Sequence, residues 1–379
     1  MLRVSILAML LATGAVSVAE AAPAEHAAFK PGTSSSGWID FTTATNAGIY
    51  LPIKINGHET MAWLYGGPSV IDKDFAASIG LADKTDAAGS TGPLTVEIGG
   101  LTLQNADVTP STQPLQSFGK VIGRPVGVLL GQDVFDHVAV DIDFARHRIA
   151  FLDPKSATKP AGAVEVPMIE QDGERVVPLS LEGAVPAQFE LEIGNVIGPL
   201  LVSPAYAQAH KLLEGHSTSQ RLVRPLTETV VTLDKLAFAG VDFPKVPIAI
   251  IPDANLPPPG IAGAVGLPLL SKFRLIIDAS HNRLYALPDP AATKTPIDKD
   301  RIGLLLGRDD NAVLFVSPNS PAEAAGFKIG DKIAQIDGKP YGSWPYRAII
   351  GFQMADAGTS HRFIMDDGTV RQVIAADFF

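Results

Sequence analysis

Short runs of alternating hydrophobic and polar residues, separated by turns rich in Gly, Asn and Pro, follow one another along most of the chain. Alternation with a period of two predicts strands that bury one face, and the turn residues mark where each strand ends. Gly (35) and Pro (30) are both plentiful among the 379 residues. The pattern therefore predicts a mainly β chain, and the length predicts two or three domains.

One hairpin pattern occurs twice along the chain, in residues 131–152 and 266–287. Each copy begins with Gly and continues with a strand that ends at Asp, a tight turn, and a second strand that begins at Arg. Chance similarity between two amphipathic hairpins is the alternative, but several special positions align without a gap, which favours a duplication. The aligned pairs are Gly131 and Gly266, Asp143 and Asp278, Arg148 and Arg283, and Leu152 and Leu287.

The segments before these hairpins also correspond. Each has two strand-like runs joined by a short turn, Asn56-Gly57 in the first copy and Glu182-Gly183 in the second. A Gly-containing turn and a helical segment follow in both. We therefore predict two similar lobes at 46–154 and 165–290, joined by a Pro/Ala/Lys-rich linker.

This order of strand, turn, strand and Gly-containing turn resembles the retroviral-type and pepsin-like aspartic proteases. It is most similar to the exported bacterial two-lobe members that carry a C-terminal PDZ domain. The resemblance implies two pseudo-symmetric, acid-protease-like β-barrel lobes with a peptide-binding cleft between them. In that family each lobe supplies one Asp from an Asp-Thr-Gly turn, and the two carboxyl groups share a proton.

The two catalytic turns of that family are degenerate in this sequence. Tyr65 stands at the first Asp position and Glu192 at the second, while Gly67 and Gly194 are kept. A Tyr has an unperturbed pKa of about 10, so it cannot activate water near neutral pH. We expect Glu192 to lack a partner carboxylate, and we hypothesise that the Tyr65 hydroxyl points toward it and forms a hydrogen bond. Drift of both residues after loss of activity is the alternative.

Three nearby features are also predicted. Asp72 and Asp74 are expected to cap a helix or to lie on a solvated face. The first-lobe flap is expected around 89–103, with Gly89, Gly92 and Gly99-Gly100 as turn or hinge positions. Its second-lobe counterpart is expected near 224–240, with Asp234-Lys235 at its turn. Ordinary surface hairpins are the alternative for both flaps.

Residues 300–379 resemble a PDZ domain (α+β), because the segment 315–340 carries its ordered string of turns and a short helix that begins at Ser320-Pro321. The resemblance implies a loop and strand edge that bind a peptide carboxylate, and a groove helix that faces the ligand. Plain core packing is the alternative for the apolar members. We expect Phe378 and Phe379 to end the last strand. The implied ligand-binding residues are Gly303, Leu304, Leu305, Leu306, Arg347 and Ile350.

Composition excludes several classes of function. The formal charge is −10 without a basic cluster, which argues against nucleic acid and anionic membranes as partners. The chain has no Cys, so disulfides and Cys-based chemistry are excluded. The eight His residues are scattered without metal-ligand spacing, so we predict no metal and no cofactor.

The N-terminal residues predict a cleaved signal peptide over 1–21. A positive start at Arg3, an apolar run over 5–18 and a cleavage pattern at 19–21 follow in order. A buried helix or a membrane anchor is the alternative, but the run is short for a bilayer span. The prediction is a periplasmic or secreted protein without a stable membrane span.

Together these features predict an exported homologue of aspartic proteases that binds peptides, unfolded protein or C-terminal protein segments, and that lacks peptidase activity. Two alternatives stay open. One is an active aspartic-type endopeptidase with a non-standard dyad built on Glu192. The other is a scaffold protein that binds through its PDZ domain.

Overall fold

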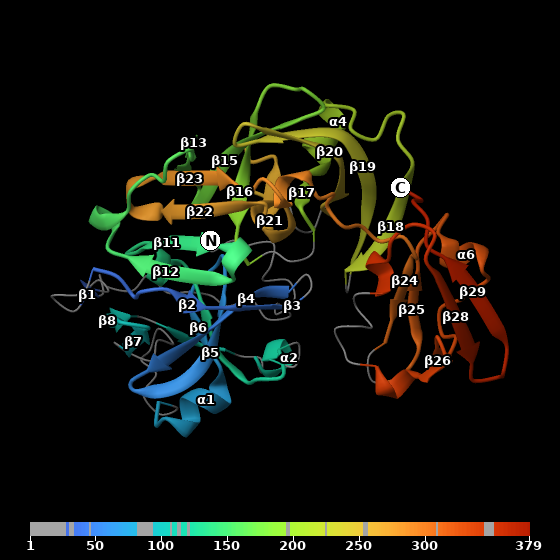
Figure 1. Cartoon of the computed structure of the whole chain (residues 1–379), viewed down its shortest axis with the longest axis horizontal. Helices are drawn as coiled ribbons and strands as arrows, with labels where there is room; N and C mark the ends of the chain where they lie inside the picture. Colours follow the sequence, from blue (N-terminus) through green and yellow to red (C-terminus); the bar gives the residue numbers. More distant parts are fainter. Residues whose placement is uncertain are drawn as a thin grey trace.

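The computed structural model describes twelve stretches of the chain (Figure 1). Strands dominate them and form curled sheets, so the prediction of a mainly β protein is confirmed. The predicted signal peptide, residues 89–93 of the first flap, Arg347 and Ile350 lie outside the described residues. In the described part, no helix has the length and apolar character needed to cross a membrane. The described residues are 28–29, 34–44, 47–81, 94–106, 108–111, 115–119, 122–194, 198–223, 226–252, 257–307, 310–344 and 352–379.

A nine-stranded sheet builds the first lobe, in the order β1-β8-β7-β4-β5-β10-β6-β9 with β3 paired to β4. Asn56 and Gly57 both have positive φ and form the β4–β5 turn, and Gly99-Gly100 forms the β7–β8 turn, both as predicted. The elements are β1 (Ala28–Phe29), β3 (Thr42–Ala44), β4 (Ala47–Ile55), β5 (His58–Leu64), β6 (Val70–Ile71), α1 (Lys73–Ser78), β7 (Leu94–Ile98), β8 (Leu101–Ala106), β9 (Thr109–Pro110), α2 (Gln116–Gly119), β10 (Val126–Leu130) and α3 (Gln132–Phe135).

A six-stranded sheet, in the order β13-β23-β22-β11-β12-β2, contains both copies of the repeated hairpin. β11 and β22 pair antiparallel, so that Val140 lies opposite Ile277 and Ile142 opposite Leu275. These two pairings exchange under the same offset that relates the sequence copies, which gives the sheet a local twofold symmetry. The strands are β2 (Ile39–Asp40), β11 (Ala139–Asp143), β12 (Arg148–Leu152), β13 (Val164–Pro167), β22 (Phe273–Asp278) and β23 (Arg283–Pro288).

The repeated Asp and Arg residues form the same ion pair in both hairpins. Arg148 Nε lies 3.1 Å from Asp143 Oδ2, and Arg283 Nε lies 3.1 Å from Asp278 Oδ2. Both carboxylates are buried, and the arginine donors hold both pKa values low against the opposing effect of burial. The sequence repeat therefore corresponds to a repeated structural device at the turn of each hairpin.

An eight-stranded sheet builds the second lobe, in the order β14-β15-β16-β21-β17-β20-β19-β18. The predicted turn at Asp234-Lys235 is wrong, because both residues lie inside β19 and the turn to β20 falls at Ala239-Gly240. Pairing with β20 overrides the polar composition of that stretch. The elements are β14 (Ile169–Gln171), β15 (Glu174–Leu181), β16 (Ala187–Glu192), β17 (Leu200–Val202), α4 (Pro204–Ala209), β18 (Thr218–Val223), β19 (Leu226–Phe238), β20 (Val241–Ile250), β21 (Gly263–Gly266) and α5 (Leu267–Leu270).

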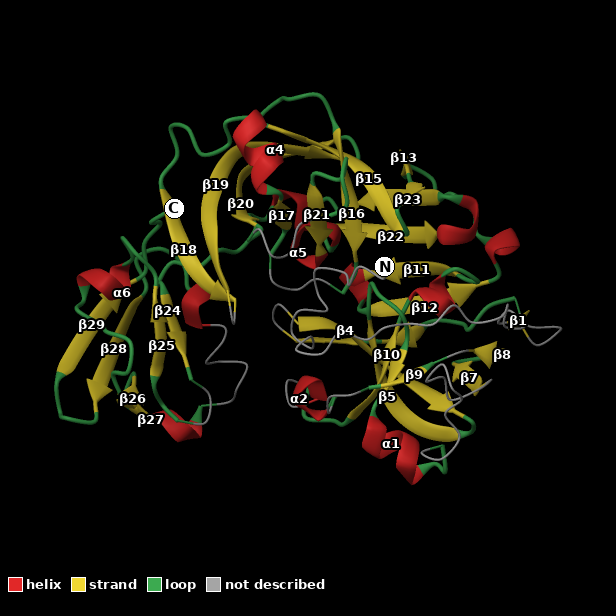
Figure 2. Ribbon diagram, turned by 180° about the vertical axis from the view of Figure 1, so that it is seen from behind, coloured by secondary structure: helices red, strands yellow, loops and turns green. Residues whose placement is uncertain are grey.

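The C-terminal region is a separate block beside β18 and β19 (Figures 1 and 2). Ser320 caps its short helix by accepting a hydrogen bond from Glu323 N, as its position in the sequence predicts. The region has its own apolar core. Its elements are β24 (Leu304–Leu306), β25 (Val313–Val316), α6 (Pro321–Ala324), β26 (Ile333–Ile336), β27 (Lys339–Pro340), a 3₁₀ turn (Phe352–Met354), β28 (Ser360–Met365) and β29 (Val370–Ile374).

The last residues turn back onto the second lobe, so the expectation that Phe378 and Phe379 end a strand is wrong. β29 ends at Ile374. The Phe379 carbonyl oxygen accepts hydrogen bonds from Lys299 Nζ (2.6 Å) and Thr232 Oγ1 (2.9 Å). The Phe379 side chain packs on an apolar patch of the second-lobe sheet, and this contact removes apolar surface from water. The patch consists of Leu201, Val230, Ala249, Ile251 and Ala264.

Candidate functional site

The turn that carries Tyr65 is fixed by close backbone contacts. Tyr65 N donates to Leu130 O, and Ser69 Oγ accepts a hydrogen bond from Gly131 N at 2.9 Å. A Cβ atom on Gly131 would lie 1.9 Å from the Gly67 carbonyl oxygen, so this approach requires Gly at position 131. Gly67 is thus part of the scaffold of the turn and holds no reacting group.

Tyr65 itself is a core residue of the first lobe. Its side chain is 5% exposed and packs in an apolar cluster that includes Tyr50, Met61 and Trp63. Asp72, seven residues further on, caps α1 by accepting hydrogen bonds from the N–H groups of Asp74 and Phe75, as predicted. The Asp72 carboxylate therefore has a structural role as a helix cap.

Glu192 ends β16 and reaches the first lobe. A Cβ atom on Gly66 would lie 2.3 Å from Glu192 Oε1, so the carboxyl group rests directly on the Gly66 backbone. Gly194 is buried in the turn that follows. The structure thus brings the two degenerate turns together. Within the described residues, however, no hydrogen bond joins the Tyr65 hydroxyl to Glu192, so the hypothesised pair is not formed.

Glu192 has partner carboxyl groups, which corrects the expectation that it is alone. Its carboxyl group lies close enough to that of Glu190 to affect its pKa, and Glu190 and Glu174 affect each other in the same way. Glu190 lies two residues earlier on β16, so both side chains leave the same face of the strand. Glu174 comes from β15, whose Val176 lies opposite Glu190. The period-two spacing of Glu190 and Glu192 was the sequence signal for this carboxyl cluster, whereas Glu174 required the strand register.

Burial dominates the electrostatics of the carboxyl cluster. Desolvation first, and interaction with the neighbouring carboxyl groups second, raise the pKa of Glu174 to about 8 and that of Glu190 well above its usual value. Burial also raises the pKa of Glu192 to about 7. For Tyr65, burial and the nearby Glu192 raise the pKa above its usual range. The cluster therefore retains protons near neutral pH, and Tyr65 stays neutral.

Glu190 and Glu192 are closed off from solvent in this conformation, whereas Glu174 is half-buried. Glu192 is 1% exposed and Glu190 is 3% exposed. Glu192 Oε2 and Glu190 Oε1 are buried without a hydrogen-bond partner in the described part of the chain. A carboxyl dyad that hydrolyses peptides must touch both a water molecule and the scissile carbonyl. Neither glutamate meets that requirement as it stands.

The residues implied by the PDZ resemblance divide into two groups. Leu304 and Leu306 are buried in the core of the C-terminal region, whereas Leu305 is half-buried. Gly303 has φ +76°, and its N–H donates to Asp300 Oδ1 at 2.7 Å. β24 pairs only with β25 among the described strands, so its other edge is the side to which a peptide strand would add.

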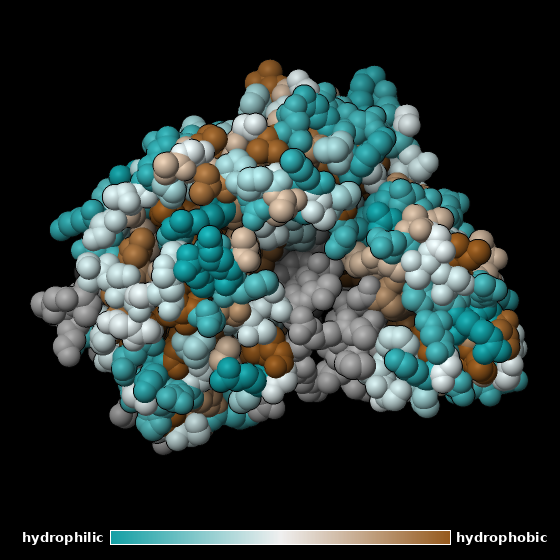
Figure 3. Space-filling view, in the orientation of Figure 1, coloured by the Kyte–Doolittle hydropathy of each residue, from teal (hydrophilic) through white to brown (hydrophobic). Residues whose placement is uncertain are grey.

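On the side shown in Figure 3, hydrophobic residues appear in small separate groups among hydrophilic ones. Individually exposed apolar residues such as Val185 and Ile329 fit this pattern.

No family model matches the sequence, and no curated protein matches it. Among solved structures, the chain is similar to an aspartic proteinase from Irpex lacteus, with 11% identity over 69% of this chain and 99% of that chain. The TM-score is 0.42. A similarity at this level does not bear on the chemistry of the site.

Proposed function

We propose that this chain is a non-hydrolytic, exported peptide- or protein-binding relative of the aspartic proteases. The observation that carries the proposal is the almost complete burial of Glu190 and Glu192. The first-lobe position opposite them holds Tyr65, whose raised pKa keeps it neutral. Tyr65 therefore cannot act as the base, and burial keeps Glu190 and Glu192 from contacting a water molecule in this conformation.

Peptide binding is supported by structural features that do not depend on a catalytic dyad. The paired turns keep their Gly scaffold, and the cleft of the resembled family binds extended chains through backbone hydrogen bonds. That mode of recognition needs strand edges and apolar pockets, and it does not need the dyad. The negative charge of the chain favours neutral or basic peptides over acidic ones.

A cleavage assay tests the absence of hydrolysis. Unfolded, fluorescently labelled casein is incubated at pH 3 to 8 with the wild-type chain and with Glu192→Ala. We expect no cleavage above background by either protein, together with binding of unstructured peptides by fluorescence anisotropy. Pepstatin-sensitive cleavage by wild type that disappears in Glu192→Ala would instead establish the active endopeptidase.

A second candidate function, a scaffold that binds through the C-terminal region, is favoured by the unpaired edge of β24. Deletion of 300–379 tests it, because peptide binding that depends on β24 is lost with that region. The deletion also removes Phe379 from the second lobe, so full-length Phe379→Ala is the matched control. Binding lost in the deletion and kept in the control assigns it to the C-terminal region.

A further inference from the structure

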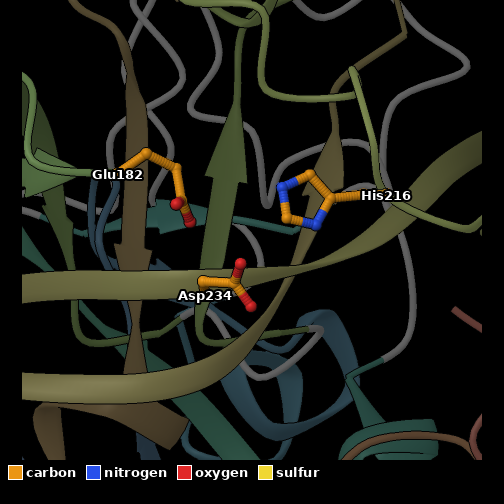
Figure 4. Close-up of side chains that lie close together, drawn as sticks. All are labelled: Glu182, His216 and Asp234. Carbon is orange, nitrogen blue, oxygen red and sulfur yellow. The ribbon is translucent and has the colours of Figure 1, made fainter.

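Three potential metal ligands that are far apart in the sequence converge on the outer side of the second lobe. Glu182, His216 and Asp234 each place one ligand atom within 4.8 Å of the others (Figure 4). Glu182 lies in the β15–β16 turn, His216 in the loop after α4, and Asp234 on β19. Sequence spacing could not reveal this group, because strand pairing and a loop bring it together.

Hydrogen bonds hold the Glu182 carboxylate in place, and an ion pair holds the Asp234 carboxylate. Glu182 is locked to β19 by two hydrogen bonds of 3.0 Å, one from its own N–H to Lys235 O and one from Lys235 N to its Oε1. Asp234 Oδ1 forms an ion pair with Lys245 Nζ. Contacts of this kind to ligating groups are what orients a metal site.

The ammonium group of Lys245 already lies against the Asp234 carboxylate. Its Nζ pairs with Asp234, and Glu182 adds to the electrostatic stabilisation of its charge. The side chain of Lys245 is exposed, so it can move away when a more highly charged ion arrives. His216 is close enough to interact electrostatically with Asp234. Two carboxylates against one ammonium leave a net negative charge beside the His216 imidazole.

We propose that Glu182, His216 and Asp234 form a surface site for a divalent transition-metal ion of the Zn²⁺ class. One imidazole and two carboxylates are the donor set that Zn²⁺ accepts in proteins, with bonds of about 2.0–2.2 Å. Ligand atoms separated by at most 4.8 Å need to move by no more than about 0.7 Å each to reach such bonds. Water fills the remaining positions. The ion ties the loop after α4 to β15 and β19, and this role is separate from the proposed peptide-binding function.

Isothermal titration calorimetry with ZnCl₂ at pH 7.5, on the chelator-treated full chain, tests the site. We expect one ion to bind to wild type and to raise its melting temperature. His216→Ala and Asp234→Asn are expected to weaken binding at least tenfold, because each removes one of three ligands. The matched control is His58→Ala, on the exposed surface of the first lobe, which is expected to bind as wild type does.

The competing lysine gives the sharpest result. Lys245→Gln removes the charge that occupies Asp234, so it is expected to tighten Zn²⁺ binding several-fold. Failure of wild type to bind Zn²⁺ at 100 μM, equal affinity in His216→Ala, or no gain in Lys245→Gln would each overturn the proposal.

Discussion

The turn after β5 and the turn after β16 occupy matching positions in the two lobes, yet they present opposite chemistry. The first presents the ring of Tyr65, packed among apolar side chains. The second presents Glu192, which belongs to a row of three carboxyl groups. Both positions are buried, and they meet at Gly66. The comparison teaches that a shared backbone scaffold does not specify the chemistry of the groups that it carries.

Making the two turns alike is expected to have the largest effect. Tyr65→Asp removes a buried aromatic ring and adds a fourth carboxyl group beside Glu192. We expect a loss of about 4 kcal/mol or more in the free energy of unfolding, measured by urea denaturation at pH 8. The loss is expected to be smaller at pH 5, where the carboxyl groups are protonated.

The conservative control for that variant is Tyr65→Leu, which loses the ring without adding charge. A Tyr65→Asp protein as stable as wild type at pH 8 would show that water enters the site. In that case the alternative of a working dyad regains support.

Neutralising the second turn is expected to have an intermediate, pH-dependent effect. The pKa of Glu192 rises on folding from 4.5 to about 7, so the folded state favours the protonated form. The resulting stability is present below pH 4.5 and is lost as the pH rises through 7. Glu192→Gln, which cannot ionise, is therefore expected to be more stable than wild type at pH 9 by on the order of 3 kcal/mol.

At pH 4 the two proteins are expected to have similar stability. Thermal unfolding followed by circular dichroism across this range measures the difference. Glu59→Gln, an exposed substitution on β5, serves as the control and should show no such trend. If Glu192→Gln were more stable than wild type by the same amount at every pH, ionisation of Glu192 would not be the cause.

Removing only the hydroxyl of the first turn is expected to have the smallest effect. Within the described residues the Tyr65 hydroxyl has no hydrogen bond to Glu192, so Tyr65→Phe should change the free energy of unfolding by less than about 0.5 kcal/mol. Urea denaturation at pH 7 measures it. A loss above about 1.5 kcal/mol would reveal a hydrogen bond between the turns.

Sequence reasoning succeeded where the signal was local. The Asp–Arg hairpins, the Asn56-Gly57 turn and the Asp72 cap depend on neighbouring residues, and all three have the predicted form. It failed where strand register decided the outcome. Glu174 joins Glu190 only because β15 pairs with β16, and Asp234 lies within a strand only because β20 pairs with it.

The sequence predicted where the candidate site lies, but it did not predict that three carboxyl groups gather there. The sequence indicated that Tyr65 and Glu192 stand at matching turns, and the structure brings those turns together. The raised pKa values arise from burial, and a linear pattern does not report how deeply a polar side chain will be buried. The assigned ligand residues Arg347 and Ile350 lie outside the described residues and stay predictions.

The return of Phe379 to the second lobe has a consequence for how this chain unfolds. Lys299, at the start of the C-terminal region, contacts Phe379 and Thr232 of β19 at once. Freeing the C-terminal region breaks these hydrogen bonds and exposes the apolar patch under the Phe379 ring to water. The two regions therefore share part of their folding free energy, so that melting one lowers the cost of melting the other.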